Sequence, residues 1–194
     1  MTNFRDIFFS PSEFLNFPND WNSIFIRDEY ELIKDVSDDF INENVLSLTQ
    51  NGIIIRDVSG NEGQVAASYE NYIKVNPGDF SLNPMDLISG WADVAEVKGI
   101  ISPSYYSFRN IGKNTNTYFV TYILQVMYEL NILYVFGKGI ASHDGKGRWG
   151  ISKDIILNLE LKLPSKEYQD RSIEILNGLI LNLNDSKYRN KVIR

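Results

Sequence analysis

The sequence predicts an α/β (α+β) domain: a curved mixed β-sheet, one long core helix, and a C-terminal helical, coiled-coil-like arm. Short runs that alternate apolar and polar residues, such as Tyr72–Asn76, are typical of half-buried strands. Residues 117–136 and 165–190 instead repeat apolar side chains at helical spacing. We expect residues 1–164 to form the domain and residues 165–194 the arm.

Length and composition fit one domain with a modest appendage. The 194 residues are 43% hydrophobic, which is enough for a core. There is no cysteine, which excludes a disulfide frame and a thiolate metal site. Residues 1–6 lack a signal-peptide pattern, and no apolar run approaches the roughly 20 residues of a membrane helix. A soluble cytoplasmic protein is the expectation.

The charge is unevenly distributed along the chain. Residues 1–100 hold 17 acidic and 6 basic side chains, and residues 101–194 hold 8 and 13, for a net charge of -6. Phosphate contacts supply most of the affinity for duplex DNA, so a DNA-binding face needs a basic side. Such a face should draw on the second half of the chain, although asymmetry of this size is also common in proteins without one.

The first 71 residues predict a helix, two strands and polar loops. Ser10 caps a short helix that starts at Pro11 and that Pro18 limits, and residues 35–43 form a loop or short helix. Residues 45–50 and 53–57 predict strands joined by a tight Asn51–Gly52 turn. Residues 58–71 predict a loop with a short helical piece.

The stretch from residue 72 to 108 is the most informative. A turn at Pro77-Gly78-Asp79 ends the strand 72–76, because proline presets φ and glycine tolerates a positive φ. Residues 80–85 are a short extended run that Pro84 stops. Gly90-Trp91 breaks the chain again, and residues 104–108 predict an aromatic strand.

Residues 109–116, RNIGKNTN, predict an exposed loop because they have almost nothing to bury. Arginine and asparagine pair bidentately with guanine and adenine edges, so the loop is a candidate for reading bases. An ordinary polar loop has the same composition.

Residues 117–136 predict the clearest helix. Its apolar stripe is expected to pack on the sheet and consists of Phe119, Tyr122, Ile123, Val126 and Leu130. Thr121, Gln125 and Asn131 are expected on the polar face, with Glu129 at its margin.

Residues 137–150 are rich in glycine and basic side chains, and can approach a phosphate backbone closely. They match neither a Walker loop nor a dinucleotide-binding loop. His143 is the only histidine, and no second group forms a catalytic or metal-ligating set with it. We therefore expect an exposed or DNA-facing His143.

Residues 155–163 predict a strand that ends at Pro164, and Ser165 begins a helix. The helix carries an apolar stripe of Ile173, Leu176, Ile180 and Leu183, with Leu179 beside it. Gly178 inside it costs roughly 1 kcal/mol relative to alanine. Such a stripe needs a partner surface, which its own domain or another chain can supply.

An ordered set of motifs resembles a known family. The chain has Gly78-Asp79 before Phe80, then Asn83-Pro84-Met85, Gly90, and finally G-I-I-S-P-x-Y-x-x-F over residues 99–108. This order resembles a target recognition domain of the type I restriction–modification specificity (S) subunit. The strand L-S-L-T at 46–49, the step R-x-x-I-S at 148–152, Pro164 and Gln169 are similar as well. Tyr168 stands where the family has glutamate, and Ile173 falls one place late.

The resemblance implies a non-catalytic protein that reads half of a bipartite DNA sequence and directs methyltransferase (modification) and restriction subunits to it. It covers nearly the whole chain but half of a complete S subunit. The chain is then a half-subunit that homodimerises through residues 166–190, a fragment of a longer protein, or a domain whose helix folds back. No cofactor, metal or membrane is expected.

The candidate DNA-binding residues come from the two loops, with residues 81–83 as a further candidate region, and both loops are expected on one exposed side. They are Arg109, Asn110, Lys113, Asn114, Asn116, Lys138, Ser142, His143, Lys146 and Arg148. Asn114, Asn116, Arg109 and His143 are the candidates for base contacts, and Lys113, Lys138, Lys146 and Arg148 for phosphate contacts.

An interaction module with the same fold and no DNA binding is the alternative, and the acidic first half favours it. A hydrolase is a third interpretation, but the sequence shows no set of a nucleophile and a base that would support it.

Overall fold

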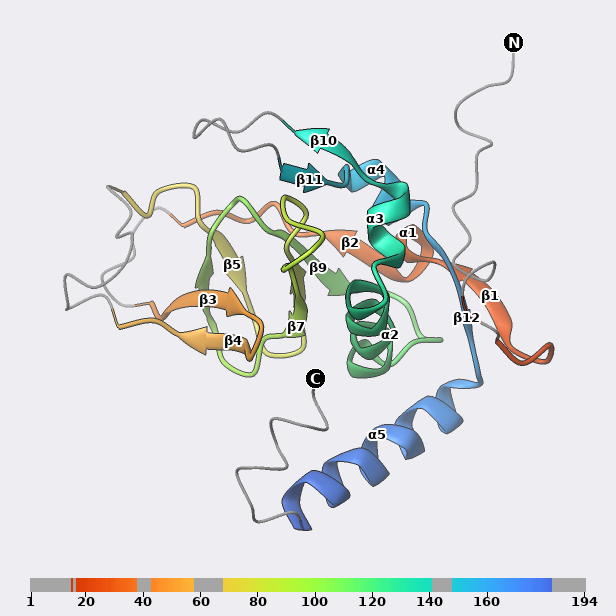
Figure 1. Cartoon of the computed structure of the whole chain (residues 1–194). Coiled ribbons are helices and arrows are strands. Elements are labelled where there is room, and N and C mark those ends of the chain that lie inside the picture. The colour runs from red at the N-terminus through yellow and green to blue at the C-terminus, as the bar shows by residue number, and fades with distance from the viewer. Residues whose placement is uncertain (1–14, 16, 38–42, 58–67, 141–147, 183–194) are drawn as a thin grey trace.

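The structure, a computed structural model, describes residues 15, 17–37, 43–57, 68–140 and 148–182. It confirms the mixed α+β class, but two four-stranded sheets replace the single sheet that we expected (Figure 1). The first sheet contains, in spatial order, β2 (Tyr30–Leu32), β9 (Tyr106–Asn110), β6 (Phe80–Leu82) and β7 (Ala92–Val94), all antiparallel. The second contains β4 (Gly52–Ile55), β3 (Val45–Thr49), β8 (Gly99–Ile101) and β5 (Ile73–Val75), and is mixed because β3 and β8 are parallel.

The two sheets are tied together where β4 meets β7. The backbone N–H of Ile53 donates a hydrogen bond of 2.7 Å to Oδ2 of Asp93 on β7. Burial raises the pKa of Asp93. Gly52 occupies the predicted tight turn with a φ of +104°, and a Cβ there would lie 2.5 Å from the same oxygen. The turn therefore needs glycine both for its φ and for the approach of Asp93.

The main core packs the first sheet against the helices that cover it, and it also takes in Leu46, Val75 and Ile101 of the second sheet. Phe80 and Phe108 stack with ring centroids 5.0 Å apart, and Tyr30 meets Phe80 edge-on at 5.1 Å. Val120, Leu124 and Met127 of α2 (Thr117–Glu129) belong to the same buried cluster, and all have 0% exposure. Helix α2 crosses the face beside β7, and α3 (Ile132–Phe136) continues from its end (Figure 1).

The predicted helix over 117–136 is correct in place but wrong in two respects. It breaks at Asn131, which takes a left-handed φ of 54°. The face that packs on the sheet is also not the predicted stripe, since Val126 and Leu130 are 45% and 58% exposed. Two apolar stripes run along this helix. The one beside Thr121 and Gln125 is buried because both polar side chains find partners: Thr121 Oγ1 donates to Thr117 O, and Gln125 Nε2 donates to Ala92 O.

The segment 155–163 is only partly the predicted strand. Ser152 Oγ accepts a hydrogen bond from the Ile155 N–H, and this cap starts α4 (Lys153–Leu157). The strand is therefore limited to β12 (Glu160–Leu163). It pairs antiparallel with β1 (Asn22–Phe25). Helix α1 (Ile26–Glu29) follows β1 directly.

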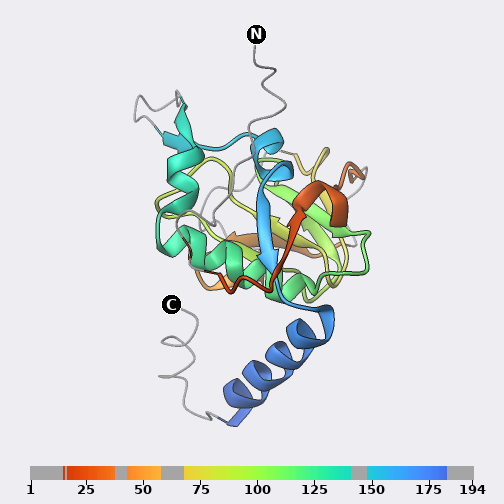
Figure 2. The same ribbon diagram turned by 90° about the vertical axis from the view of Figure 1, so that its right-hand side faces the viewer.

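Helix α5 (Lys166–Asn182) is the predicted arm, and it runs away from the domain (Figures 1 and 2). Ile173 is 6% exposed, so the first turns pack on the arm's own domain, in part against α2. Tyr168, Ile175 and Leu179 form another stripe, each more than half exposed. None of the helices in the described part of the chain is long and apolar enough to cross a membrane.

Three other expectations cannot be compared with the fold. The helix at 10–15, most of the loop at 58–71 and much of the segment at 35–43 lie outside the described residues.

Candidate nucleic-acid interface

Arg109, predicted to contact bases, lies in β9 and forms an internal ion pair. Its Nε and Nη2 donate to the two carboxylate oxygens of Asp79 at 3.0 and 2.8 Å. Asp79 is 4% exposed and also accepts from the Asn76 N–H at 2.8 Å, which fixes the turn after β5. The hydrogen bonds to the Asp79 carboxylate raise the pKa of Arg109 above its ordinary value. The Gly78-Asp79 motif thus joins a turn of positive φ to a buried ion pair.

The predicted exposed loop begins later than residue 109, and its asparagines also have internal partners. Asn110 ends β9 and donates from Nδ2 to the carbonyl and hydroxyl oxygens of Thr115 at 3.2 and 3.1 Å. Asn114 donates from its backbone N–H and from Nδ2 to the carboxylate of Glu29, at 3.0 and 2.7 Å. Glu29 is 5% exposed. A Cβ at Gly112 would lie 1.9 Å from Glu29 Oε2, so the loop closes tightly over this carboxylate.

Asn116 connects the loop to two helices. Its Oδ1 accepts from the Phe119 N–H at 3.2 Å, which caps α2. Its Nδ2 donates to Asp170 of α5 at 2.7 Å, and its N–H donates to Gln169 Oε1 at 2.9 Å. These bonds give the loop an architectural role, and Lys113 is the candidate cation that remains exposed on it. Ser81 is fully buried, with its Oγ 2.8 Å from that of Ser107, so it is not at the surface.

The glycine-rich segment forms an antiparallel hairpin of β10 (Lys138–Ile140) and β11 (Arg148–Gly150). Lys138 is exposed at its base, where it pairs with Gly150, and Arg148 is exposed at the other end of β11, where it pairs with Ile140. Trp149 stacks on Tyr134 of α3 with centroids 4.8 Å apart, and its Nε1 donates to Tyr134 O at 2.7 Å. Ser142, His143 and Lys146 lie outside the described residues.

The hairpin is fixed to the domain. The Leu87 N–H donates to Trp149 O at 3.0 Å, and the Ile151 N–H donates to Pro84 O at 2.8 Å. A Cβ at Gly137 would lie 2.6 Å from the Leu87 side chain and 2.7 Å from Trp149, so only glycine fits there. The base of the hairpin is therefore rigidly presented.

The structure places the two predicted loops at opposite ends of the α2–α3 pair. Loop 111–116 precedes α2 and lies beside the start of α5, whereas the hairpin follows α3 at the other end of the α2–α3 pair (Figures 1 and 2). A helix of 20 residues spans about 30 Å, so the predicted helix between the loops was itself the signal for their separation.

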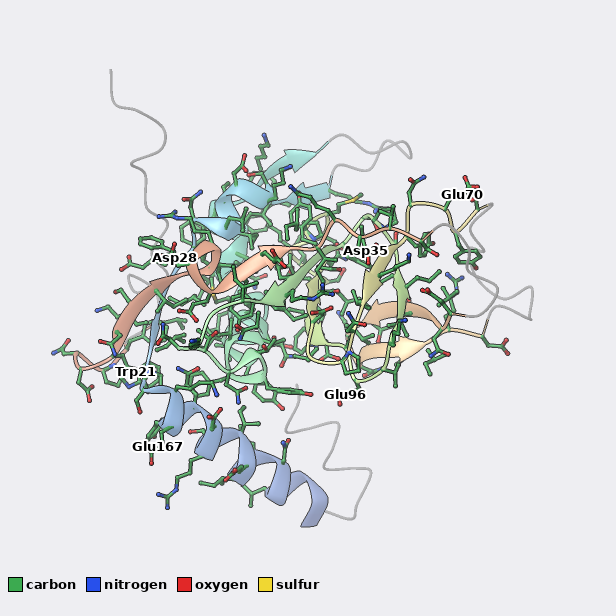
Figure 3. The ribbon with its side chains drawn as sticks, turned by 180° about the vertical axis from the view of Figure 1, so that it is seen from behind. Trp21, Asp28, Asp35, Glu70, Glu96 and Glu167 are labelled. Atoms are coloured by element: carbon green, nitrogen blue, oxygen red, sulfur yellow. The ribbon has the colours of Figure 1, made fainter. Side chains whose placement is uncertain are left out.

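A further cationic surface adjoins the hairpin. Helix α4 follows β11 directly, and the hairpin and α4 lie together along the top of the molecule (Figures 1 and 3). A groove of about 630 Å³ is lined by β2, α4 and the end of β9; its charged lining residues are Arg27, Lys34, Arg109 and Lys153, together with Glu31 and Asp35. Sequence reasoning missed Arg27, Lys34 and Lys153 because they are scattered in the sequence. Within the described ranges, no group of three or more His, Cys, Asp or Glu side chains could hold a metal ion.

Solved structures of other proteins share this fold. The HsdS subunit from Thermoanaerobacter tengcongensis matches with a TM-score of 0.51 and 14% identity, over 87% of this chain and 39% of that chain. The type I restriction–modification S subunit from M. genitalium matches at 0.52 and 14%, over 87% and 42%. A chain from a type I R-M system, studied for complex assembly and conformational transition, matches at 0.54 and 13%, over 92% and 43%.

These matches confirm the S-subunit fold that the motifs predicted, and the chain spans about two fifths of the length of each of these structures. No protein-family model and no curated protein matches the sequence.

Proposed function

We propose that the chain is a DNA-specificity component, one recognition domain with one arm, of a type I restriction–modification system. The observation that carries the proposal is the fold, which matches S subunits over 87% or more of the chain. In this role it binds duplex DNA sequence-specifically. It performs no covalent chemistry, and it directs the modification and restriction subunits to the site.

The hairpin β10–β11 is the element that we expect to enter a DNA groove. A two-stranded ribbon fits the major groove, where base pairs are distinguishable. The hairpin is anchored at its base, where Lys138 is exposed, and Arg148 is exposed at the end of β11 next to residues 141–147. Lys153, exposed on α4, extends the cationic surface away from the hairpin. We expect base contacts from the segment 141–147, with Ser142 and His143, and phosphate contacts from Lys138, Lys146, Arg148 and Lys153.

The arm is the element that we expect to bind a second copy of the chain. The stripe of Tyr168, Ile175 and Leu179 faces away from the arm's own domain. Two arms that pair through this stripe would form a homodimer with two recognition domains. Two-fold symmetry in the protein imposes the same symmetry on its target, so the dimer would read a bipartite palindrome.

The alternative is an interaction module that does not bind DNA. The internal partners of Arg109, Asn110, Asn114 and Asn116 favour it, because they engage four candidate contacts within the domain itself. Affinity for random duplex that falls steeply with salt supports DNA binding, and no affinity at low salt supports the alternative.

Substitution of Lys138 and Lys153 by alanine is expected to weaken binding to random duplex. Each lost phosphate contact should reduce the slope of log affinity against log salt by about 1, so the double variant should lose about 2. Lys113→Ala is the matched control, since Lys113 is an exposed lysine at the other end of α2. A loss of slope in the Lys113 variant alone would move the interface to loop 111–116.

A further inference from the structure

Several side-chain hydrogen bonds join the domain to the arm. Gln169, in the first turns of α5, has 0% exposure. Its Oε1 accepts from the Asn116 N–H at 2.9 Å, and its Nε2 donates to the carbonyl oxygens of Asn114 at 3.0 Å and Pro164 at 2.8 Å. Gln169 is part of the arm, and its side chain therefore connects the arm to the loop before α2 and to the end of β12.

Asp170 adds a second connection at the next position. It accepts from Asn116 Nδ2 at 2.7 Å, and Lys166 Nζ lies 2.6 Å from both of its carboxylate oxygens. These hydrogen bonds lower the pKa of Asp170, with that from Asn116 as the largest cause. The carboxylate thus remains ionised and paired at neutral pH.

The far side of the junction is also fixed. Asn114 is bonded to the buried carboxylate of Glu29 at the end of α1, and Asn116 caps α2. The loop that receives the arm is therefore held by two elements of the domain. Asn177 and Leu179, which follow Leu176, are both exposed, so the packing of the arm on the domain weakens after its first turns.

We infer that Gln169 and Asp170 are positioning residues, which fix the direction of the arm and so set the separation of two recognition domains joined through their arms. Helix α5, the described part of the arm, has 17 residues, and is therefore about 25 Å long at 1.5 Å per residue. A change of about 20° at its base would move its far end by about 9 Å, roughly two to three base pairs at 3.4 Å each. A junction of this kind selects one spacer length in the DNA target.

The effect on DNA rests on the proposed function, but the geometry does not, so two experiments separate them. The first measures the distance between spin labels at Ile88→Cys on the domain and Asn177→Cys on the arm. The chain has no cysteine of its own, and both positions are exposed. Dilution with unlabelled chain restricts the signal to pairs within one molecule.

The labelled chain is expected to give one narrow distance distribution, and Gln169→Met or Asp170→Ala to broaden or shift it. Methionine keeps much of the volume of Gln169 and loses its hydrogen bonds, and Asp170→Ala tests the junction from a partly exposed position. Glu167→Ala, on an exposed residue of the same turn, is the control and should leave the distribution unchanged. Distributions for both variants that match the unsubstituted chain would overturn the inference.

The second experiment selects spacer length from duplexes that carry two fixed half-sites. The unsubstituted chain should enrich one spacer, and Gln169→Met should lose that preference while its affinity for a single half-site is unchanged. Equal spacer preference in the two proteins would overturn the role in spacing. If neither protein binds any duplex, the proposed function fails, and the label distances still decide whether the junction fixes the arm.

Discussion

Arg109→Ala is expected to lower the free energy of unfolding by about 2–3 kcal/mol. The substitution leaves the Asp79 carboxylate buried without its cation, and breaking a buried pair in this way costs about 3–5 kcal/mol. We expect a smaller loss for Arg109→Ala because the Arg109 side chain is 37% exposed and its charge is partly screened by solvent. Urea denaturation of the two proteins measures the difference.

Lys74→Ala is the control for this prediction. Lys74 Nζ lies 3.8 Å from Oδ1 of Asp35, whose side chain is 65% exposed. Exposed pairs of this kind contribute about 0–1 kcal/mol, so the loss should be within that range. Equal losses for the two variants would show that the Arg109–Asp79 pair is no more than a surface contact.

Ile175→Asp combined with Leu179→Asp is expected to abolish the proposed homodimer. The two side chains are 55% and 54% exposed, so carboxylates there should not unfold the domain. Buried at a dimer interface, however, two carboxylates in each chain would repel and lose hydration. Light scattering should show twice the chain mass of 22.3 kDa for the unsubstituted protein and a single chain mass for the variant.

The loss of the dimer should appear in DNA binding as well. Linking two modules raises the overall affinity by about 10²–10⁴-fold, so affinity for a two-part target should fall by about 100-fold or more. Asn177→Asp, which places a carboxylate on the opposite face of α5, is the control and should remain dimeric. A stable monomer of the unsubstituted chain at high concentration would contradict the dimer directly.

Local chemistry made much of the fold predictable. Gly52 and Gly78 tolerate the positive φ that their turns need, and Pro84 fixes φ and lacks a backbone donor, so these residues mark where strands end whatever surrounds them. The start of α5 after Pro164 follows the same logic. By contrast, the division into two sheets depends on contacts between distant residues, such as that of Ile53 with Asp93. No single segment contains that information.

The burial of α2 and the roles of the loop residues were less predictable. Both faces of α2 are apolar enough to pack. The face that contains Gln125 can be buried because the Gln125 side chain donates a hydrogen bond to Ala92 O. Similarly, asparagine and arginine suit a DNA edge and a buried carboxylate equally well. What decided the matter for Asn114 and Arg109 was the proximity of Glu29 and Asp79, which are distant in sequence.

The arm shows the same limit in a milder form. Its predicted stripe was expected to need one partner surface, but the domain covers Ile173 while Tyr168, Ile175 and Leu179 stay exposed. The helix therefore offers one stripe to its own domain and another to solvent. The side chain of Ile180, and Leu183, lie outside the described residues.

Selection from a random duplex library, with the modification subunit added, tests the central claim most directly. A specificity component with paired arms should enrich one bipartite sequence with two-fold symmetry, and binding should fall steeply as salt rises. An unenriched library, together with no binding to any duplex at low salt, would contradict the claim and leave a shared fold without DNA recognition.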